Sequence, residues 1–567
     1  MRIIGAPSPL DKPAQTLSSS PAPEALTLRG LFPIPAIVSA ATAFATLVPF
    51  LFLGNPSGHD FEFHVFSWME VVHQWKQGIA FPRWASLAHW TFGEARFLFY
   101  PPASWNLGAL LGAILPWKIA PGAYIWVAIT ASGCSMFLLA RRWLTRNDAL
   151  FAAALYAANP YHLVIVYWRS ALAELLAACL LPLLLLFVLR SDDEGPGMIL
   201  PMSLVVAAAW LTNAPSAVMV NYSLALLVVV VAVVRRSPKI LCYGAAAVVL
   251  GAAMAAFYLV PAAYEEKWIN LGEVLAPGVR PLDNFLFTAI NDPDHNRFNL
   301  LVSIVASAEI VALAAAIYLT RKLREREPIA FWTLTCWAAA ASLLMCSFTY
   351  IFWEHLPKLR FVQLPWRWLL CLNVAFAILV AMAIRPWLKR FLLCATLLLL
   401  LGIVWHRVQQ PWWDSAADIQ EMQDAIEDGA GYEGTDEYVP AGVDPYELNK
   451  NAPQVAVASG RPAHIRILAW QTQSKRFTAE VTRPEKLRLR LFNYPAWRVE
   501  VNGAPIKAKS QPVTGEIVVP LETGISEVHV KFIQTSDRFW GGVISLLAWL
   551  FAALWVRRQR MRSALIV

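Results

Sequence analysis

Charged side chains are scarce in this chain of 567 residues. Only 15% of the residues are Asp, Glu, Lys or Arg, whereas 57% are hydrophobic. Soluble globular domains carry about 25% charged residues. Many apolar runs reach the roughly 20 residues that a helix needs to cross a bilayer. The composition therefore excludes an ordinary soluble protein and predicts an α-helical polytopic membrane protein whose surroundings are a lipid bilayer.

Cysteine is absent from the most polar part of the chain. None of the seven cysteines follows residue 407, and all of them fall inside hydrophobic runs. A disulfide framework and a CxxC metal site are therefore both excluded. The chain also lacks an internal repeat.

A net charge of +8 could suggest a nucleic-acid partner, but the basic residues form short clusters between hydrophobic runs. Clusters of this kind orient membrane helices, and they favour the cytoplasmic side. We therefore expect no nucleic acid as a partner. The clusters are Arg141–Arg142, Arg235–Arg236, Arg321–Arg326, Arg385–Arg390 and Arg557–Arg562.

The apolar runs predict about twelve spans, with both termini in the cytoplasm of a bacterium and the chain in its inner membrane. Residues 1–30, rich in Pro and Ser, are expected to be a disordered cytoplasmic tail without a cleavage pattern. Every strong basic cluster then falls on the cytoplasmic side. The spans are expected at 31–53, 121–140, 148–166, 170–189, 198–212, 216–234, 240–262, 299–320, 329–350, 364–384, 391–406 and 539–556.

This arrangement divides the chain into a transmembrane domain (31–406) with a large first external loop (54–120), an external region (407–538), and a last helix with a basic tail (539–567). The apolar segment from Pro101 to Pro116 is too short to be a span, so we expect an interfacial or re-entrant helix there.

The external region after residue 407 begins with an acidic, turn-rich segment. From about residue 463 hydrophobic and polar residues alternate, and Asn502-Gly503 is typical of a hairpin turn. We predict an acidic linker followed by a small β-sandwich.

Ionisable residues in the first loop stand among aromatic ones. Between Asp60 and Gln77 a helix would place an apolar stripe beside a polar edge that carries Asp60, His64 and Ser67. A carboxylate there could act as a general base, with His64 holding it in place. Alternatively, Asp60 simply caps the helix.

Four histidines of the same loop raise the alternative of a metal site: His59, His64, His73 and His89. A zinc site on this helix would need two histidines in an HxxxH spacing and a further carboxylate ligand. Only Asp60 and His64 come near this pattern. A divalent metal ion therefore stays open as a cofactor, and no other cofactor is predicted.

Three further ionisable residues lie at the ends of predicted spans. Arg169 and Glu174 are close together in the sequence, and Arg367 starts a later span. Ionisable groups at such depths are costly and mark functional candidates. An arginine could hold a lipid phosphate bidentately, although Arg367 could also snorkel to the headgroups.

The order of these features resembles that of the GT-C glycosyltransferases. More narrowly, several motifs resemble bacterial membrane proteins labelled "6-pyruvoyl-tetrahydropterin synthase-related", although nothing matches the three-histidine zinc site of the soluble synthase. The segment from Leu491 to Gly503 also resembles the external domain of YfhO-type proteins. The motifs are His59–His64, Gly78–Trp84, Phe97–Pro102, Leu364–Trp368 and Gly431–Tyr438.

The GT-C resemblance implies inverting transfer of a hexosyl or pentosyl group. The donor would be a polyprenyl-phosphate-linked sugar, and the acceptor an envelope glycan, lipid or protein. By motif, the resemblance makes Asp60 the candidate base and Glu62 its substitute. Glu174 takes the place of a second acidic element without completing an acidic pair.

The remaining substrate-binding candidates are Arg169, Arg367 and Tyr100. Two other functions stay open. A transporter or flippase of lipid-linked glycan would need ionisable residues near mid-membrane. A non-catalytic envelope assembly protein would need no acidic residue in the first loop.

Overall fold

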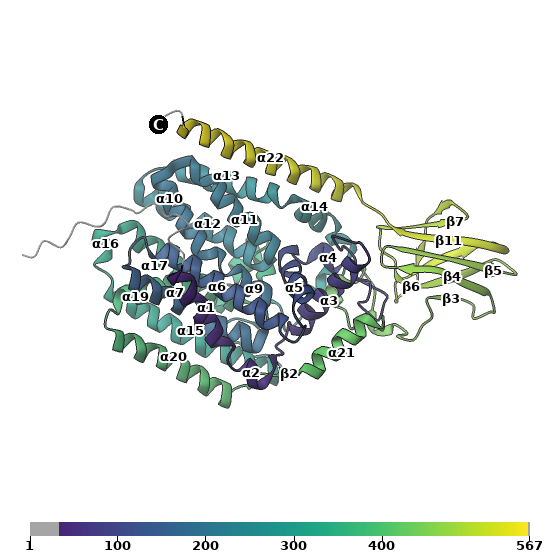
Figure 1. Ribbon diagram of the computed structural model, residues 1–567, viewed down its shortest axis with the longest axis horizontal. Coiled ribbons are helices and arrows are strands. Elements are labelled where there is room, and N and C mark those ends of the chain that lie inside the picture. The colour runs from purple at the N-terminus through teal and green to yellow at the C-terminus, as the bar shows by residue number, and fades with distance from the viewer. Residues whose placement is uncertain (1–32, 565–567) are drawn as a thin grey trace, which may run out of the picture.

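The computed structural model describes residues 33–564. Figure 1 shows a body of helices with a β-sandwich at one end, and the long helix α22 (Ser536–Ala564) leads from the sandwich back along the helices. The predicted architecture of a polytopic helical membrane protein with a small β-structured region near the C-terminus is confirmed.

Within residues 33–564, nine helical segments are long and apolar enough to cross a membrane, or up to eleven when each of two bent pairs counts as one span. We expected twelve. The difference lies in the 41-residue segment Leu172–Thr212, which covers two of the expected spans. Its helices α10 (Leu180–Glu194) and α11 (Ile199–Thr212) are separated by a 3-10 turn and pack against each other.

The other candidate spans follow the predicted positions closely. In one bent pair, Lys239–Met254 meets Ala256–Trp268 at 79°. In the other, Pro328–Leu344 meets Ser347–His355 at 95°. The helices are α1 (Ile34–Leu47), α2 (Phe50–Leu53), α6 (Ala120–Ala140), α7 (Arg146–Ala157), α8 (Pro160–Val164), α9 (Leu172–Ala177), α12 (Ala214–Arg235), α13 (Lys239–Met254), α14 (Ala256–Glu265), α15 (Pro293–Leu319), α16 (Leu323–Arg326), α17 (Pro328–Leu344), α18 (Tyr350–His355), α19 (Leu369–Ala383) and α20 (Trp387–Arg407).

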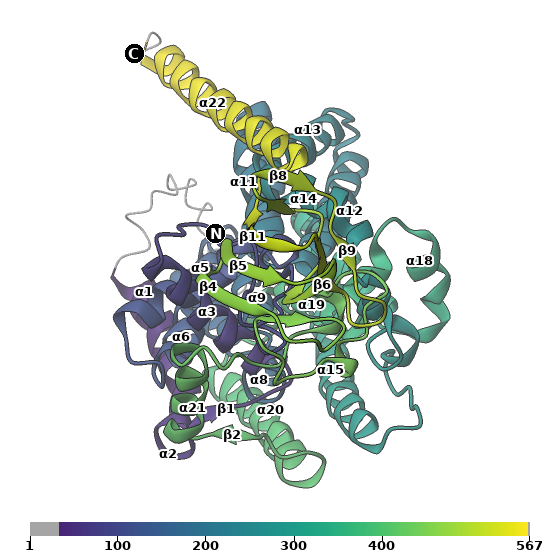
Figure 2. The same cartoon turned by 90° about the vertical axis from the view of Figure 1, so that its right-hand side faces the viewer.

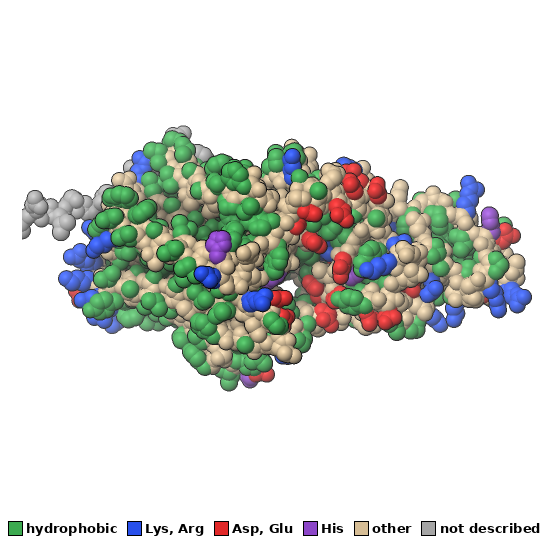
Figure 3. Space-filling view, turned by 90° about the horizontal axis from the view of Figure 1, so that it is seen from below, with side chains coloured by type: hydrophobic (Ala, Val, Ile, Leu, Met, Phe, Trp, Pro, Cys, Tyr) green, Lys and Arg blue, Asp and Glu red, His purple; other side chains and the backbone are tan. Residues whose placement is uncertain are grey.

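Loops that carry the basic clusters meet at one end of the helical body. Their ion pairs join Arg142 to Asp193 at 3.1 Å, Arg235 to Asp192 and Arg390 to Asp148. Figure 3 shows Lys and Arg side chains at the end opposite the sandwich, and Asp and Glu side chains near the junction with the sandwich. Hydrophobic side chains dominate the surface between these two zones, as expected for a surface in contact with lipid.

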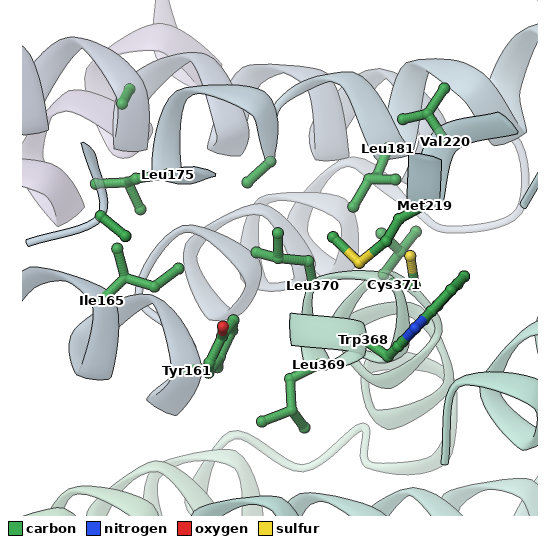
Figure 4. Packing of buried hydrophobic residues seen from close by; sticks show 14 of the residues in the cluster. Tyr161, Ile165, Leu175, Leu181, Met219, Val220, Trp368, Leu369, Leu370 and Cys371 are labelled. Atoms are coloured by element: carbon green, nitrogen blue, oxygen red, sulfur yellow. The ribbon is translucent and has the colours of Figure 1, made fainter. Parts of the chain in front are cut away.

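Beneath the first loop, the core of the helical body is tightly packed. Figure 4 shows Ile165, Leu175 and Tyr161 on one side, Met219 and Cys371 on the other, and Leu370 between them. All these side chains are buried in one continuous cluster. Arg169 and Glu174 therefore belong to a segment whose apolar side chains are packed into the core.

The first loop forms three helices: α3 (Phe61–Lys76), α4 (Arg96–Phe99) and α5 (Pro102–Ile114). Helix α5 has 13 residues and is too short to span a bilayer, as predicted. Helix α3 packs against α5 and α21 (Ala416–Glu427). Its polar edge does not line an open cavity throughout, because His64 and Ser67 are buried.

Residues 455–532 form two antiparallel sheets, of which Figure 2 gives an end view. One sheet has the strand order β3-β6-β10-β9 and the other β4-β5-β11-β7-β8. The strands are β3 (Val455–Val457), β4 (His464–Gln471), β5 (Ser474–Val481), β6 (Glu485–Phe492), β7 (Trp497–Val501), β8 (Ala504–Ile506), β9 (Lys509–Ser510), β10 (Glu516–Leu521) and β11 (Gly524–Phe532).

The sandwich shares its core with the first loop. Trp84 is fully buried, and its ring centre lies 5.5 Å from that of Tyr494 and 5.8 Å from that of Trp497. Phe92 packs on Phe492 in the same way. The two regions are thus held as one unit by apolar contacts.

Candidate functional site

The segment that leads to Asp60 docks on a break in a membrane helix. The short strands β1 (Asn55–Pro56) and β2 (Trp413–Asp414) pair at its start. The Gly58 N–H then donates to Ser170 Oγ at 2.9 Å. A Cβ at Gly58 would stand 2.5 Å from the Trp168 carbonyl oxygen, so only glycine fits there.

The break itself is irregular backbone. Residues Ile165–Arg169 form a π-helical turn, and Ser170 follows with a φ of 49°. Such turns often mark functional sites. The Arg169 carbonyl accepts the Asp60 N–H at 2.9 Å, which fixes Asp60 beside the broken helix.

The Asp60 side chain does not cap the helix that it precedes. Asp60 takes the N-cap position of α3, but its side chain accepts no capping hydrogen bond. Its carboxylate lies 3.5 Å from Arg169 Nη2, and the side chain is 40% exposed. The capping alternative is therefore not realised, and the carboxylate is left accessible.

Glu174 links the buried arginines. It receives hydrogen bonds from the Tyr161 hydroxyl at 2.6 Å, from Arg169 Nη1 at 2.7 Å and from Arg367 Nε at 3.0 Å. Arg367 also donates through Nη1 to the Val362 carbonyl at 2.7 Å. The predicted residues Asp60, Arg169, Glu174 and Arg367 thus form one chain of charges, although they come from three separate segments.

Aromatic rings surround this chain of charges. The Arg169 guanidinium lies 4.8 Å from the centre of the Trp366 ring. Tyr100 packs on Phe63, with ring centres 4.7 Å apart. Burial and, next, the Asp60 carboxylate raise the pKa of Tyr100 well above its usual value. Its hydroxyl therefore stays protonated near Asp60 and can donate a hydrogen bond.

His64 is buried against Tyr100 rather than bonded to Asp60. Its ring centre lies 5.9 Å from that of Tyr100, and its Nε2 has no hydrogen-bond partner among the described residues. Burial lowers the pKa of His64 to about 4, so the ring is neutral at pH 7. In this structure Arg169, not His64, is the residue paired with Asp60.

Glu62 faces a different group of residues. Partial burial, followed by repulsion from Asp414 and Glu433, raises its pKa. It makes no ion pair in the described part of the chain, whereas Asp60 is held by Arg169. Asp60, and not Glu62, is thus the carboxylate that joins the chain of charges.

A second polar network, which the sequence reasoning missed, fastens residues 431–438 to the first loop. The buried Glu94 pairs with Arg96 and with His89 Nε2 at 3.0 Å, and it accepts the Thr435 N–H at 2.8 Å. Gly434 must lack a Cβ because one would stand 2.2 Å from His89. In the sequence, only Gly431 and Gly434 could have indicated that this segment packs closely against another part of the chain.

Glu94 and Glu70 differ in their electrostatics. Burial tends to raise the pKa of Glu94, but Arg96 and His89 outweigh it and lower the value to about 2. Glu70 accepts a hydrogen bond from the Tyr432 hydroxyl at 2.6 Å, yet burial still raises its pKa. Both carboxylates bind residues 431–438 to the first loop, and neither bonds to a described residue of the chain of charges around Asp60.

The four histidines do not converge. His89 pairs with Glu94, and His59 packs on Phe298, with ring centres 4.8 Å apart. Among residues 33–564, no group of three or more His, Cys, Asp or Glu side chains could hold a metal ion. The described residues therefore do not fit the metal-site alternative.

Several solved structures resemble this chain at low similarity. The arabinofuranosyltransferase AftD from Mycobacteria gives a TM-score of 0.41 at 19% identity, covering 68% of this chain and 27% of its own. ArnT from Cupriavidus metallidurans bound to undecaprenyl phosphate gives 0.40 at 12%, covering 70% and 75%. The Archaeoglobus fulgidus oligosaccharyltransferase gives 0.36 at 14%, covering 71% and 56%. This chain therefore spans only about a quarter of AftD.

No curated protein matches the sequence. A family model does match, described as "6-pyruvoyl-tetrahydropterin synthase related domain; membrane protein", and it covers residues 97–410. This stretch is more than half of the chain and contains Glu174, Arg169 and Arg367. The chain therefore belongs to the 6-pyruvoyl-tetrahydropterin synthase related family of membrane proteins.

Proposed function

We propose that this protein is a membrane glycosyltransferase. It moves a sugar from a polyprenyl-phosphate carrier to a cell-envelope glycan, lipid or protein. The observation that carries the proposal is the accessible Asp60 carboxylate, 40% exposed and held 3.5 Å from Arg169 in a setting of buried charges and aromatic rings.

Asp60 acts as the general base. The acceptor hydroxyl gives its proton to the Asp60 carboxylate while its oxygen bonds to the anomeric carbon of the sugar. The bond from that carbon to the carrier phosphate breaks, and the phosphate leaves with the electron pair. Attack opposite to the leaving phosphate inverts the anomeric centre.

Arg367 and Arg169 hold the carrier phosphate. Arg367 uses Nε and Nη1 for Glu174, Val362 and Gln363, so Nη2 remains for a phosphate oxygen. Arginine suits this role because its N–H groups match phosphate oxygens in pairs. Glu174 positions both guanidinium groups, and Tyr100 supplies a hydroxyl donor at the same place.

The reaction takes place at the outer face of the bacterial inner membrane. The basic loops meet at the end of the helical body opposite the sandwich, and positive loops favour the cytoplasm. Both termini then lie in the cytoplasm, and Asp60 lies with the sandwich outside. Reporter fusions after Arg236 and near residue 470 would report opposite sides, and a cytoplasmic signal at 470 would contradict the assignment.

A transporter of lipid-linked glycan is a second candidate, because Glu309 is a fully buried carboxylate inside α15. Asn373 Nδ2 donates to Glu309 at 3.1 Å, so one oxygen is already engaged. Mid-membrane carboxylates are common in transport pathways. This function predicts translocation of lipid-linked sugar without a new glycosidic bond.

Glycan and lipid analysis of a deletion strain separates the two functions. A transferase predicts that one sugar modification disappears while its intact lipid-linked donor accumulates on the outer leaflet. A transporter predicts accumulation on the inner leaflet. A non-catalytic assembly protein predicts that an Asp60→Asn gene restores the glycans as well as the wild-type gene does.

A further inference from the structure

A cavity of about 380 Å³ lies where the first loop, α14, the sandwich and α22 meet. Its walls include the aromatic side chains of Phe81, Phe257 and Phe532 and the polar side chains of Arg83, Gln473, Gln534 and Arg538. Its volume is within the range of small-ligand pockets, which commonly combine apolar walls with a few polar groups. None of its lining residues belongs to the chain of charges around Asp60.

The two arginines of the cavity are in different states. Arg538 is buried and bound to Glu265 through Nε at 2.7 Å and Nη2 at 2.8 Å, and the Tyr494 hydroxyl also donates to Glu265. Arg538 is therefore neutralised by its partner. Asp537 is the other carboxylate near this pair.

Arg83 has no such partner. It makes no hydrogen bond or ion pair in the described part of the chain, and its guanidinium carbon lies 4.5 Å from the centre of the Phe81 ring. Burial and, next, repulsion from Arg538 lower the pKa of Arg83 to about 10, and attraction from Glu265 and Asp537 offsets only part of this decrease. The group therefore still carries its charge at pH 7. A half-buried cation whose N–H groups have no partner among residues 33–564 is a ready site for an anion.

The position of the cavity indicates the source of that anion. Ile533, Gln534 and Arg538 flank the start of the candidate span Ser536–Gln559. Phe539 and Trp540 at this start are 53% and 59% exposed, as is usual for aromatics at a membrane interface. Lipid headgroups of that leaflet therefore lie beside the cavity, whose aromatic walls suit the apolar part of the same molecule.

We propose that this cavity binds the phosphate of an anionic lipid headgroup, with Arg83 as the cation that holds it. The site is separate from the transferase site and does not depend on the proposed function. Phosphatidylglycerol is a suitable probe, because it carries one phosphate diester and no compensating cation.

The test is thermal unfolding of the detergent-purified protein titrated with phosphatidylglycerol, phosphatidylcholine or inorganic phosphate. The expected result is a saturable rise in the unfolding midpoint with phosphatidylglycerol only. Arg83→Gln should weaken the apparent affinity by about tenfold, because one charge-assisted hydrogen bond is lost, and Arg83→Lys should weaken it less. Arg466→Gln, on an exposed residue of β4, should leave it unchanged.

Arg83→Gln should fold normally, since Arg83 makes no hydrogen bond or ion pair among residues 33–564, and equal midpoints without lipid would verify this. Equal responses of the wild type and Arg83→Gln to phosphatidylglycerol would overturn the site. Equal responses to phosphatidylglycerol and phosphatidylcholine would overturn its preference for an anion. A response to inorganic phosphate as strong as that to the lipid, and dependent on Arg83, would overturn the lipid as the source.

Discussion

Replacing Glu174 with Gln tests whether the buried charges hold the site together. The side chain is 1% exposed, and it accepts bonds from Arg169 and Arg367, which are 4% and 8% exposed. Removing one partner of a buried ion pair costs roughly 3–5 kcal/mol, because the remaining charge stays desolvated. Glu174→Gln keeps the shape of the side chain and one acceptor oxygen. The loss of stability therefore measures the contribution of the carboxylate charge.

The matched control is Asp193→Asn, which breaks an ion pair of which Asp193 is 57% exposed. Exposed pairs contribute about 0–1 kcal/mol. Thermal unfolding of both variants in one detergent should therefore give a clearly lower midpoint for Glu174→Gln and an almost unchanged one for Asp193→Asn. Equal midpoints for the two variants would refute the reasoning.

Three further predictions concern the surroundings of the site. Gly58→Ala should abolish sugar transfer, since its Cβ would stand 2.5 Å from the Trp168 carbonyl oxygen, whereas Gly272→Ala, with nothing within 4 Å, should retain it. Trp84→Ala should cost roughly 3–5 kcal/mol and speed tryptic cleavage around the sandwich; the control Tyr446→Ala, on a 76% exposed residue, should not. Burial raises the pKa of Glu437 to about 7, above an unfolded value of about 4.3. The contribution of the protonated carboxyl to the stability of the fold is therefore complete below about pH 4.3 and is lost as the pH rises through about 7. Glu437→Gln should therefore unfold at a higher temperature than the wild type at pH 8.5 but at the same temperature at pH 4.5.

The fold was largely predictable because each span is encoded by its own apolar run. The residues from 172 to 212 show the limit, since the helical turns between α10 and α11 leave no gap where one span ends. The polar edge of α3 shows a second limit. Its His64 and Ser67 looked exposed by periodicity, but α5, α21 and Arg96 cover them through contacts between distant segments.

The sequence singled out the four residues of the chain of charges but not the geometry that joins them. Asp60 stood out among the aromatic residues of the first loop. Arg169, Glu174 and Arg367 stood out as ionisable groups at the ends of apolar runs. Their pairing depends on the π-helical turn before Ser170 and on Gly58, and periodicity does not reveal a π-turn. The network of Glu94 with Thr435 joins residues 341 positions apart, a separation that local patterns do not encode.

Sugar transfer by purified Asp60→Asn protein tests the central claim, that the Asp60 carboxylate is the general base. Asn keeps the size of the side chain, and Arg169 stays bound to Glu174, so folding should be preserved. With the lipid-linked donor and acceptor supplied, the account predicts a loss of turnover of about 10² or more, whereas the control Glu62→Gln keeps the wild-type rate. Wild-type turnover by Asp60→Asn would contradict the account, and a loss of turnover in Glu62→Gln would then identify Glu62 as the base.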